Sequence, residues 1–141
     1  MTKSASADAP GHLWLLAVLL LVWHALLAAD YTIARFALGI DLPSIDPVLM
    51  AGPTWTQIAW ALAVWTGLAG AIFAMLRDDA AVLLFFAAFI GVLVALIGVE
   101  LSAPPELVLG YARYSVYAAL LLVPLIGWIY TRAMKRALVL H

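Results

Sequence analysis

Four charged residues lie within long apolar stretches of this sequence: Asp30, Arg35, Glu100 and Arg113. A charge inside a membrane-spanning helix is unfavourable, so each one marks a candidate site for which a partner should be sought. We expect Asp30 or Glu100 to face Arg113, because a buried charge needs an opposite charge beside it. The side chains expected to supply hydrogen bonds to this cluster are Gln57, Tyr31, Tyr114 and Tyr117.

Two interpretations of this polar cluster stay open. The charged pairs either fix the register of neighbouring helices, or they line a small polar cavity that binds a solute. Proton and ion pathways usually place a carboxylate near the middle of the bilayer, whereas Asp30 and Glu100 lie toward the ends of their apolar stretches. The pattern therefore favours the structural interpretation.

His24 is the titratable side chain nearest the middle of an apolar stretch, and the other two histidines are close to the termini. We expect His24 to donate a hydrogen bond between helices. A di-haem four-helix cytochrome needs paired axial ligands on facing helices, and the sequence does not offer them. No cofactor and no metal site is predicted.

Cysteine is absent, which excludes thiolate nucleophiles, iron–sulfur ligation and cysteine-type zinc sites. The sequence also contains no pairing of a nucleophile with a base and no phosphate-binding loop, so we predict that the protein is not an enzyme. The net charge of −1 gives no surplus of Lys and Arg for a nucleic-acid backbone. Nucleic acid is therefore not an expected partner.

Composition identifies the solvent that surrounds these residues. Hydrophobic residues make up 67% of the 141-residue chain and charged residues 11%, against about 45–50% and about 25% in a typical soluble domain. A small folded chain leaves much of its side-chain surface outside, so the outside of this one must face lipid. The lipid bilayer is the first expected partner.

Four apolar stretches are long enough to cross a bilayer as helices, which takes about 20 residues each. They span residues 13–38, 54–76, 80–101 and 107–130. The predicted fold class is therefore all-α, an integral membrane four-helix bundle with antiparallel up-down topology. Residues 13–131 form the transmembrane domain, with an N-terminal tail at 1–12 and a basic C-terminal tail at 132–141.

The connections between the spans carry helix-ending and helix-starting residues. Asp46 before Pro47 is typical of an N-cap followed by the first helical position, and it predicts a single short turn. Arg77 is a cation suited to the end of one helix, and the two aspartates after it suit the start of the next. Lys and Arg concentrate on the side of the two tails, so both termini are expected in the cytoplasm of a bacterium, with the protein in the inner membrane.

Small residues recur at helical spacing in the second and third spans. In lipid, helices associate by close packing at such positions. The second and third spans are expected to pack together through these stripes, and Gly67→Leu is expected to separate them. The packing residues are Ala59, Ala63, Gly67 and Ala71 in the second span, and Gly91, Ala95 and Gly98 in the third.

The sequence resembles an uncharacterised family of small proteobacterial four-span membrane proteins, some of which carry the label "sugar transporter". The resemblance covers about the first two thirds of the chain and adds no mechanism, since no sugar-binding cluster accompanies it beyond the polar residues above. The residues that carry it are Trp23, Asp30-Tyr31-Thr32, Pro53, Trp55, the stretch Trp60-Ala61-Leu62-Ala63-Val64-Trp65, Gly67, Gly70, Leu76-Arg77 and residues 81–86.

These observations predict a non-enzymatic accessory or structural subunit of a larger inner-membrane complex, of the respiratory or photosynthetic type. Short loops and abundant Trp and small residues favour contacts with other transmembrane helices, from that complex or from a second copy of the chain. The alternative is a small oligomeric transporter or channel that uses Asp30, Glu100 and Arg113 to bind a solute. Packing is the expected role of the deeper tryptophans Trp23, Trp60 and Trp65, with contact to a quinone or pigment as the alternative.

Overall fold

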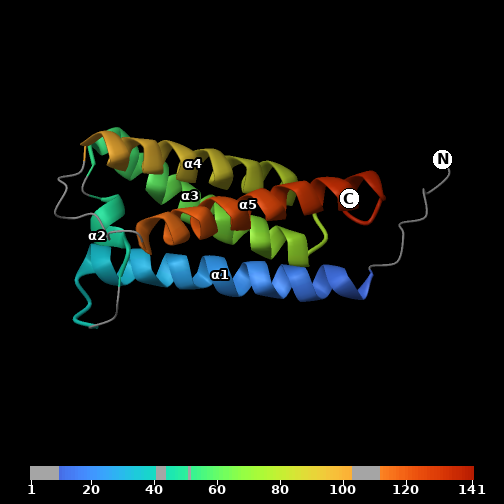
Figure 1. The fold of residues 1–141 in the computed structure, drawn as a ribbon. Coiled ribbons are helices and arrows are strands. Elements are labelled where there is room, and N and C mark those ends of the chain that lie inside the picture. Colours follow the sequence, from blue (N-terminus) through green and yellow to red (C-terminus); the bar gives the residue numbers. More distant parts are fainter. Residues whose placement is uncertain (1–9, 41–43, 51, 103–111) are drawn as a thin grey trace.

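A computed structural model describes residues 10–40, 44–50, 52–102 and 112–141 of the chain. Within these residues the chain forms five helices (Figure 1): α1 (Gly11–Phe36), α2 (Asp46–Leu49), α3 (Thr54–Met75), α4 (Ala80–Ser102) and α5 (Ala112–Arg136). All but the short α2 are long and apolar enough to cross a membrane. The protein is a multi-pass helical bundle in which successive long helices run in opposite directions.

The helix limits follow local chemistry. α1 ends at Phe36 because Ala37 adopts a left-handed conformation (φ 47°) and its N–H bonds back to the carbonyl of Ile33. α3 and α4 begin at the predicted positions and end within one residue of them. The predicted first residues of the fourth span, 107–111, lie outside the described residues. α5 continues past the predicted end at residue 130 to Arg136, so part of the predicted basic tail is helical.

α3 and α4 lie side by side along most of their length, and small residues allow this close approach. A Cβ atom added to Gly91 would lie 2.9 Å from both the carbonyl oxygen of Ala59 and the Cβ of Ala63. A Cβ on Gly98 would overlap the side chain of Thr56. No larger residue fits at either glycine without moving the helices apart.

Gly67 lies in a different contact from the one predicted for it. A Cβ on Gly67 would overlap the imidazole ring of His24, which belongs to α1 and not to α4. Successive turns of α3 face different neighbours because the helix is covered by α4 on one side and α1 on another. The substitution Gly67→Leu is therefore expected to displace α1 from α3, rather than to separate α3 from α4.

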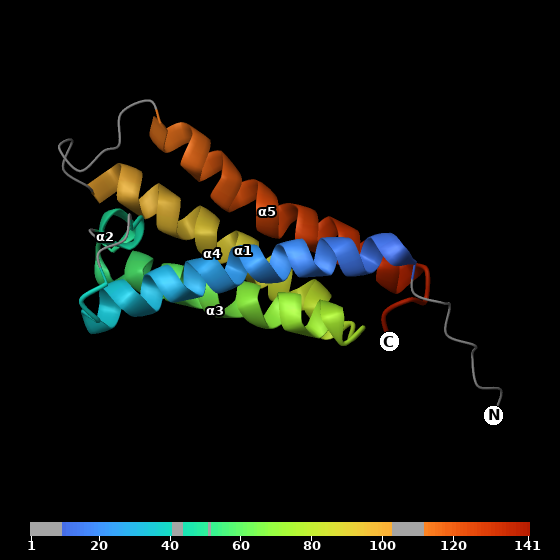
Figure 2. The ribbon, with the colours of Figure 1, turned by 90° about the horizontal axis from the view of Figure 1, so that it is seen from below.

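The two ends of the bundle differ in their connections. α2 packs against one end, where Asp46 and Leu49 are buried. We call this the acidic end, defined by Asp30, Asp46 and Glu100. Figure 2 shows that α5 begins at this end well away from α1 and comes alongside it only farther along.

The opposite end, which we call the hairpin end, contains the turn between α3 and α4 and both termini of the described chain. After α5 the chain reverses at Leu138 (φ 57°). Val139 and Leu140 are then buried against the bundle. The guanidinium Nε of Arg77 donates to the carbonyl of Val139 (3.1 Å), and the N–H of His141 donates to the carbonyl of Arg77 (3.0 Å). The last residues are thus folded onto the α3–α4 turn.

Candidate functional site

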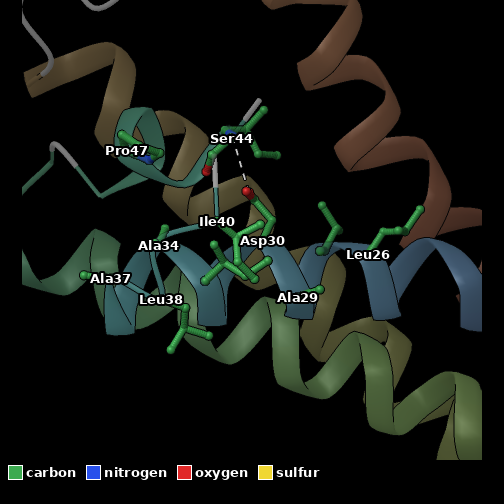
Figure 3. Close-up of a pocket in the computed structure, with 13 residues that line it drawn as sticks. Leu26, Ala29, Asp30, Ala34, Ala37, Leu38, Ile40, Ser44 and Pro47 are labelled. Atoms are coloured by element: carbon green, nitrogen blue, oxygen red, sulfur yellow. Dashed lines mark hydrogen bonds between the residues drawn. The ribbon is translucent and has the colours of Figure 1, made fainter. Parts of the chain in front are cut away.

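A hollow lies on the outer flank of the bundle at the acidic end. It has a volume of about 750 Å³ and lies between the last turns of α1 and the segment that leads into α2 (Figure 3). Its lining is almost entirely apolar, with Leu26, Ile33 and Ile45 among the larger side chains. The polar side chains in it are Asp30 and Ser44. We refer to it as the Asp30 hollow.

Asp30 connects the two walls of this hollow. Its Oδ2 accepts a hydrogen bond of 3.3 Å from the backbone N–H of Ile45, drawn as the dashed line in Figure 3. The bond is long for an N–H to a carboxylate, whose usual range is about 2.7–2.9 Å. The Asp30 side chain is only half-buried. A carboxylate in this setting can accept further hydrogen bonds from a donor that enters the hollow.

Asp46 is the most deeply buried carboxylate of the described residues, with 4% of its surface exposed. Its Oδ1 accepts the indole N–H of Trp60 at 3.0 Å, and Trp60 is fully buried. Burial raises the pKa of the Asp46 carboxyl above its usual value, and the charge of Asp30 raises it further. The Trp60 N–H and the charge of Arg35 act in the opposite direction on this pKa.

Sequence reasoning missed the contact between Asp46 and Trp60. Asp46 was interpreted as a helix cap from the proline after it, and Trp60 as a packing residue from its place in an apolar span. Only the position of α2 against the end of the bundle brings them together. A tryptophan facing an aspartate 14 residues earlier has no spacing rule in sequence, so no signal pointed to this pair.

At the same end of the bundle, Gln57 holds the chain between α2 and α3 in place by hydrogen bonds. Its amide nitrogen donates to the carbonyls of Met50 (3.0 Å) and Gly52 (2.9 Å). Both bonds satisfy backbone oxygens that no helix pairs. Gln57 therefore positions a connection, and it does not face Asp30 or Arg113 in the described structure.

The second charged group joins α4 to α5. Arg113 Nη1 lies 3.6 Å from Glu100 Oε1, with side chains 20% and 42% exposed respectively. Arg113 Nη2 also donates to the hydroxyl of Tyr114 at 2.6 Å. Tyr117, one helical turn along α5 from Arg113, is half-buried. Of the two pairings predicted for Arg113, the structure forms the one with Glu100.

The predicted polar cluster is thus divided between two places. Asp30 lies on α1 beside the chain that enters α2, while Glu100, Arg113, Tyr114 and Tyr117 lie on α4 and α5, which diverge from α1 at this end (Figure 2). Arg35 is exposed in the last turn of α1. Tyr31 packs its ring edge-on against Trp65, with ring centroids 6.2 Å apart. The described residues therefore form no single cavity lined by all of the predicted residues.

His24 is buried, with 2% of its surface exposed, and its Nδ1 lies 2.8 Å from the carbonyl oxygen of Leu20 in the preceding turn of its own helix. This is a correction to the expected bond between helices. The contacts of the ring with neighbouring helices are instead made by packing, against Gly67 of α3 and against Phe85 of α4 with ring centroids 5.6 Å apart. His24 fills the space that the missing side chain of Gly67 leaves.

Chemistry that needs several clustered ligands has little support among the described residues. No group of three or more His, Asp or Glu side chains that could hold a metal ion is found there. The two carboxylate groupings instead offer hydrogen-bond acceptors and one ion pair at the end of the bundle. Such groups can anchor connections and can receive a hydrogen-bond donor from outside.

Comparisons with known proteins found no matching family model, no matching curated protein and no matching solved structure.

Proposed function

We propose that this chain is a non-enzymatic accessory subunit that packs against a larger protein assembly in the inner membrane of a bacterium, of the respiratory or photosynthetic type. The observation that supports the proposal is the location of the hollows, which are larger on the outer surface of the bundle than in its core. A hollow between the side chains at the centre of the described bundle has a volume of only about 10 Å³. That volume is close to the lower limit for a single water molecule. Larger hollows open on the outer surface.

The Asp30 hollow is the part of that surface best suited to recognition. The hollow has a volume of about 750 Å³ and an apolar lining beside the half-buried carboxylate of Asp30. It can accommodate an apolar side chain together with a Lys, Arg or amide donor from a neighbouring helix. The carboxylate lies near the end of α1, where a partner's charged side chain remains close to water. Both requirements are met by a transmembrane helix of another subunit.

The arrangement of basic residues supports an orientation for this subunit. Arg77, Arg132, Lys135 and Arg136 lie at the hairpin end, while Arg35 and Arg113 lie at the acidic end with three carboxylates. Cytoplasmic flanks are enriched in Lys and Arg. We therefore place the hairpin end and both termini in the cytoplasm and the acidic end in the periplasm.

The alternative, a small oligomeric transporter, needs the charged groups to line one solute pathway. Asp30 and Arg113 lie on helices that diverge at the acidic end, so a single copy of the chain does not bring them together. A pathway would have to form between copies. This requirement favours the accessory subunit and defines the experiment that separates the two functions.

The absence of cysteine makes that experiment simple, because one introduced cysteine is the only thiol. Ala34→Cys places a crosslinker in the Asp30 hollow, and Leu62→Cys on the exposed face of α3 serves as the matched control. For an accessory subunit, mild-detergent purification yields a stoichiometric set of larger membrane subunits, and one of them crosslinks to residue 34 but not to residue 62. Recovery of a homo-oligomer whose solute flux is lost in Arg113→Ala would replace the proposal with the transporter.

A further inference from the structure

The last turns of α5 carry a cationic face that none of the contacts above uses. Trp128, Arg132 and Arg136 follow one another at steps of four, so their side chains lie on one side of the helix. With Ile129 and Ala133 they line a hollow of about 440 Å³. We call this the α5 basic hollow.

The two arginines in this hollow retain their charge for an outside partner. The Arg132 guanidinium lies 5.7 Å from the centre of the Trp128 ring, a cation–π contact that leaves the positive charge in place. Within the described part of the chain, neither Arg132 nor Arg136 forms an ion pair, whereas Lys135 between them lies 2.6 Å from Asp79. Both arginine side chains are exposed.

An apolar groove continues from the same residues toward the middle of the bundle. Its volume is about 290 Å³, and it lies between α4 and α5, with Trp128 and Arg132 shared by both hollows. Leu83 and Phe86 of α4 line it and are 70% and 39% exposed. The Phe86 and Trp128 rings are in contact, with centroids 5.1 Å apart. Arg132 and Trp128 therefore lie at the boundary between the cationic α5 basic hollow and the apolar groove.

We propose that the α5 basic hollow binds the headgroup of an anionic phospholipid, whose acyl chain lies in the groove between α4 and α5. A guanidinium matches the geometry of phosphate oxygens and can bind two of them at once. Trp128 lies in the last part of α5, and tryptophan is enriched near the ends of spans, where its ring meets lipid headgroups. Two arginines balance a lipid with net negative charge, whereas the choline group of a zwitterionic lipid would be repelled. The pair between Lys135 and Asp79 is already neutral and bounds the groove at its outer edge.

This inference does not depend on the proposed accessory function, and binding to the purified chain tests it. The full chain in detergent micelles is titrated with phosphatidylglycerol or with phosphatidylcholine, and bound lipid is counted by native mass spectrometry. The double variant Arg132→Gln/Arg136→Gln removes both cations. The control Arg35→Gln/Arg113→Gln removes the same total charge from the acidic end, at the opposite end of the bundle from the hollow.

We expect the dissociation constant for phosphatidylglycerol to rise roughly 30-fold in the Arg132→Gln/Arg136→Gln variant. This figure counts the usual contribution of one basic residue near an anionic surface once for each of the two arginines. The control variant should change it by less than about threefold, since both of its cations lie at the other end of the bundle, beyond the range of screened charge interactions. Arg132→Lys/Arg136→Lys should give an intermediate affinity, because lysine keeps the charge and loses the two-oxygen contact of the guanidinium. Phosphatidylcholine binding should be the same in all variants.

Three results would overturn the inference. They are equal binding of the two lipids, an equal loss of affinity in the control variant, and displacement of phosphatidylglycerol by an equal concentration of inorganic phosphate, which would identify a simple anion site. Salt provides a readout that needs no variant. Phosphatidylglycerol binding to the unaltered chain should weaken as sodium chloride is raised, while phosphatidylcholine binding stays constant.

Discussion

The acidic end and the hairpin end of the bundle are closed by different chemistry, although the same helices run between them. At the acidic end, a long helix is hydrogen-bonded to the short helix α2 by buried groups. The N–H of Trp60 in α3 donates to the carboxylate of Asp46 in α2. At the hairpin end the closing ion pair, Lys135 with Asp79, is 53% and 42% exposed. Buried hydrogen bonds depend on geometry and protonation, while exposed ion pairs depend on salt.

The difference also assigns roles to the two ends. A buried carboxylate such as Asp46, which accepts the indole N–H of Trp60, stabilises a connection and is hardly accessible to a partner. Exposed cations that form no ion pair in the described chain, such as Arg132, remain available for one. The acidic end is therefore fixed by its own contacts, with Asp30 as the acceptor left partly open, and the hairpin end offers charge to the membrane surface.

The largest effect is expected from Asp46→Ala, which removes the acceptor of the buried Trp60 N–H. A hydrogen bond to a charged group is worth about 1.5–3 kcal/mol, and an unpaired buried donor is unfavourable in itself. We expect a loss of about 2–3 kcal/mol in the free energy of unfolding, measured by titrating the protein in detergent micelles with sodium dodecyl sulfate. Asp46→Asn retains an acceptor oxygen and should lose less than half as much. An equal loss in both variants would contradict a role for this bond.

A smaller effect is expected from Gly98→Ala, which tests whether the acidic end is packed more tightly than the helices near the hairpin. The new Cβ overlaps Thr56, whereas Gly70→Ala places its Cβ 3.3 Å from Leu84 and Phe85. Overpacking of a well-packed contact costs about 1–3 kcal/mol. Gly98→Ala should lower the unfolding free energy by about 1–2 kcal/mol in the same titration. The Gly70→Ala variant should stay within about 0.5 kcal/mol of the unaltered chain.

Protonation of Asp46 makes the stability of the acidic end depend on pH. Since burial raises the folded-state pKa of Asp46, the folded state binds its proton more readily than the unfolded state does. The stability that this group contributes is complete below the unfolded value of 3.8 and is lost as the pH rises through the folded pKa.

The measurement for this prediction is the difference in unfolding free energy between the unaltered chain and Asp46→Asn. On acidification from about pH 7 to about pH 4, the unaltered chain should gain stability relative to the variant, which has no carboxyl group at this position. The difference therefore reports on the carboxyl group at position 46 and its interactions. A difference that is constant with pH would show that Asp46 has the same pKa folded and unfolded.

The sequence predicted the long helices well because a bilayer sets their length and forbids unpaired backbone groups within it. The starts of α3 and α4 followed from the residues before them. Pro53 directly precedes α3, and the Asp78 carboxylate accepts the N–H of Ala80, the first residue of α4. α5 ran farther than its apolar stretch because Arg132 and Lys135 are good helix formers that extend into the membrane surface.

The site was less predictable, because the lateral order and tilt of helices are set by contacts that hydropathy does not contain. Either Asp30 or Glu100 was expected to face Arg113, and the structure pairs Arg113 with Glu100. Whether Asp30 could reach Arg113 depended on the distance between α1 and α5 at the acidic end. No sequence pattern specified that distance. Gly67 likewise faces His24 rather than α4 because α3 has two neighbours, and a stripe of small residues does not say which one it meets.

The smallest effect is expected at the hairpin end, from the ion pair between Lys135 and Asp79. The nitrogen and oxygen are 2.6 Å apart, but more than two fifths of each side chain is exposed. Exposed pairs contribute about 0.2–1 kcal/mol in double-mutant cycles. A cycle of Lys135→Gln and Asp79→Asn should give a coupling energy in this range at low salt that falls toward zero near 1 M sodium chloride, where the screening length is about 3 Å.

The equivalent cycle of Asp46→Ala with Trp60→Phe should keep its coupling energy at high salt, because both groups are buried away from ions. If the two cycles responded alike to salt, the ends would not differ in the way that their exposure implies.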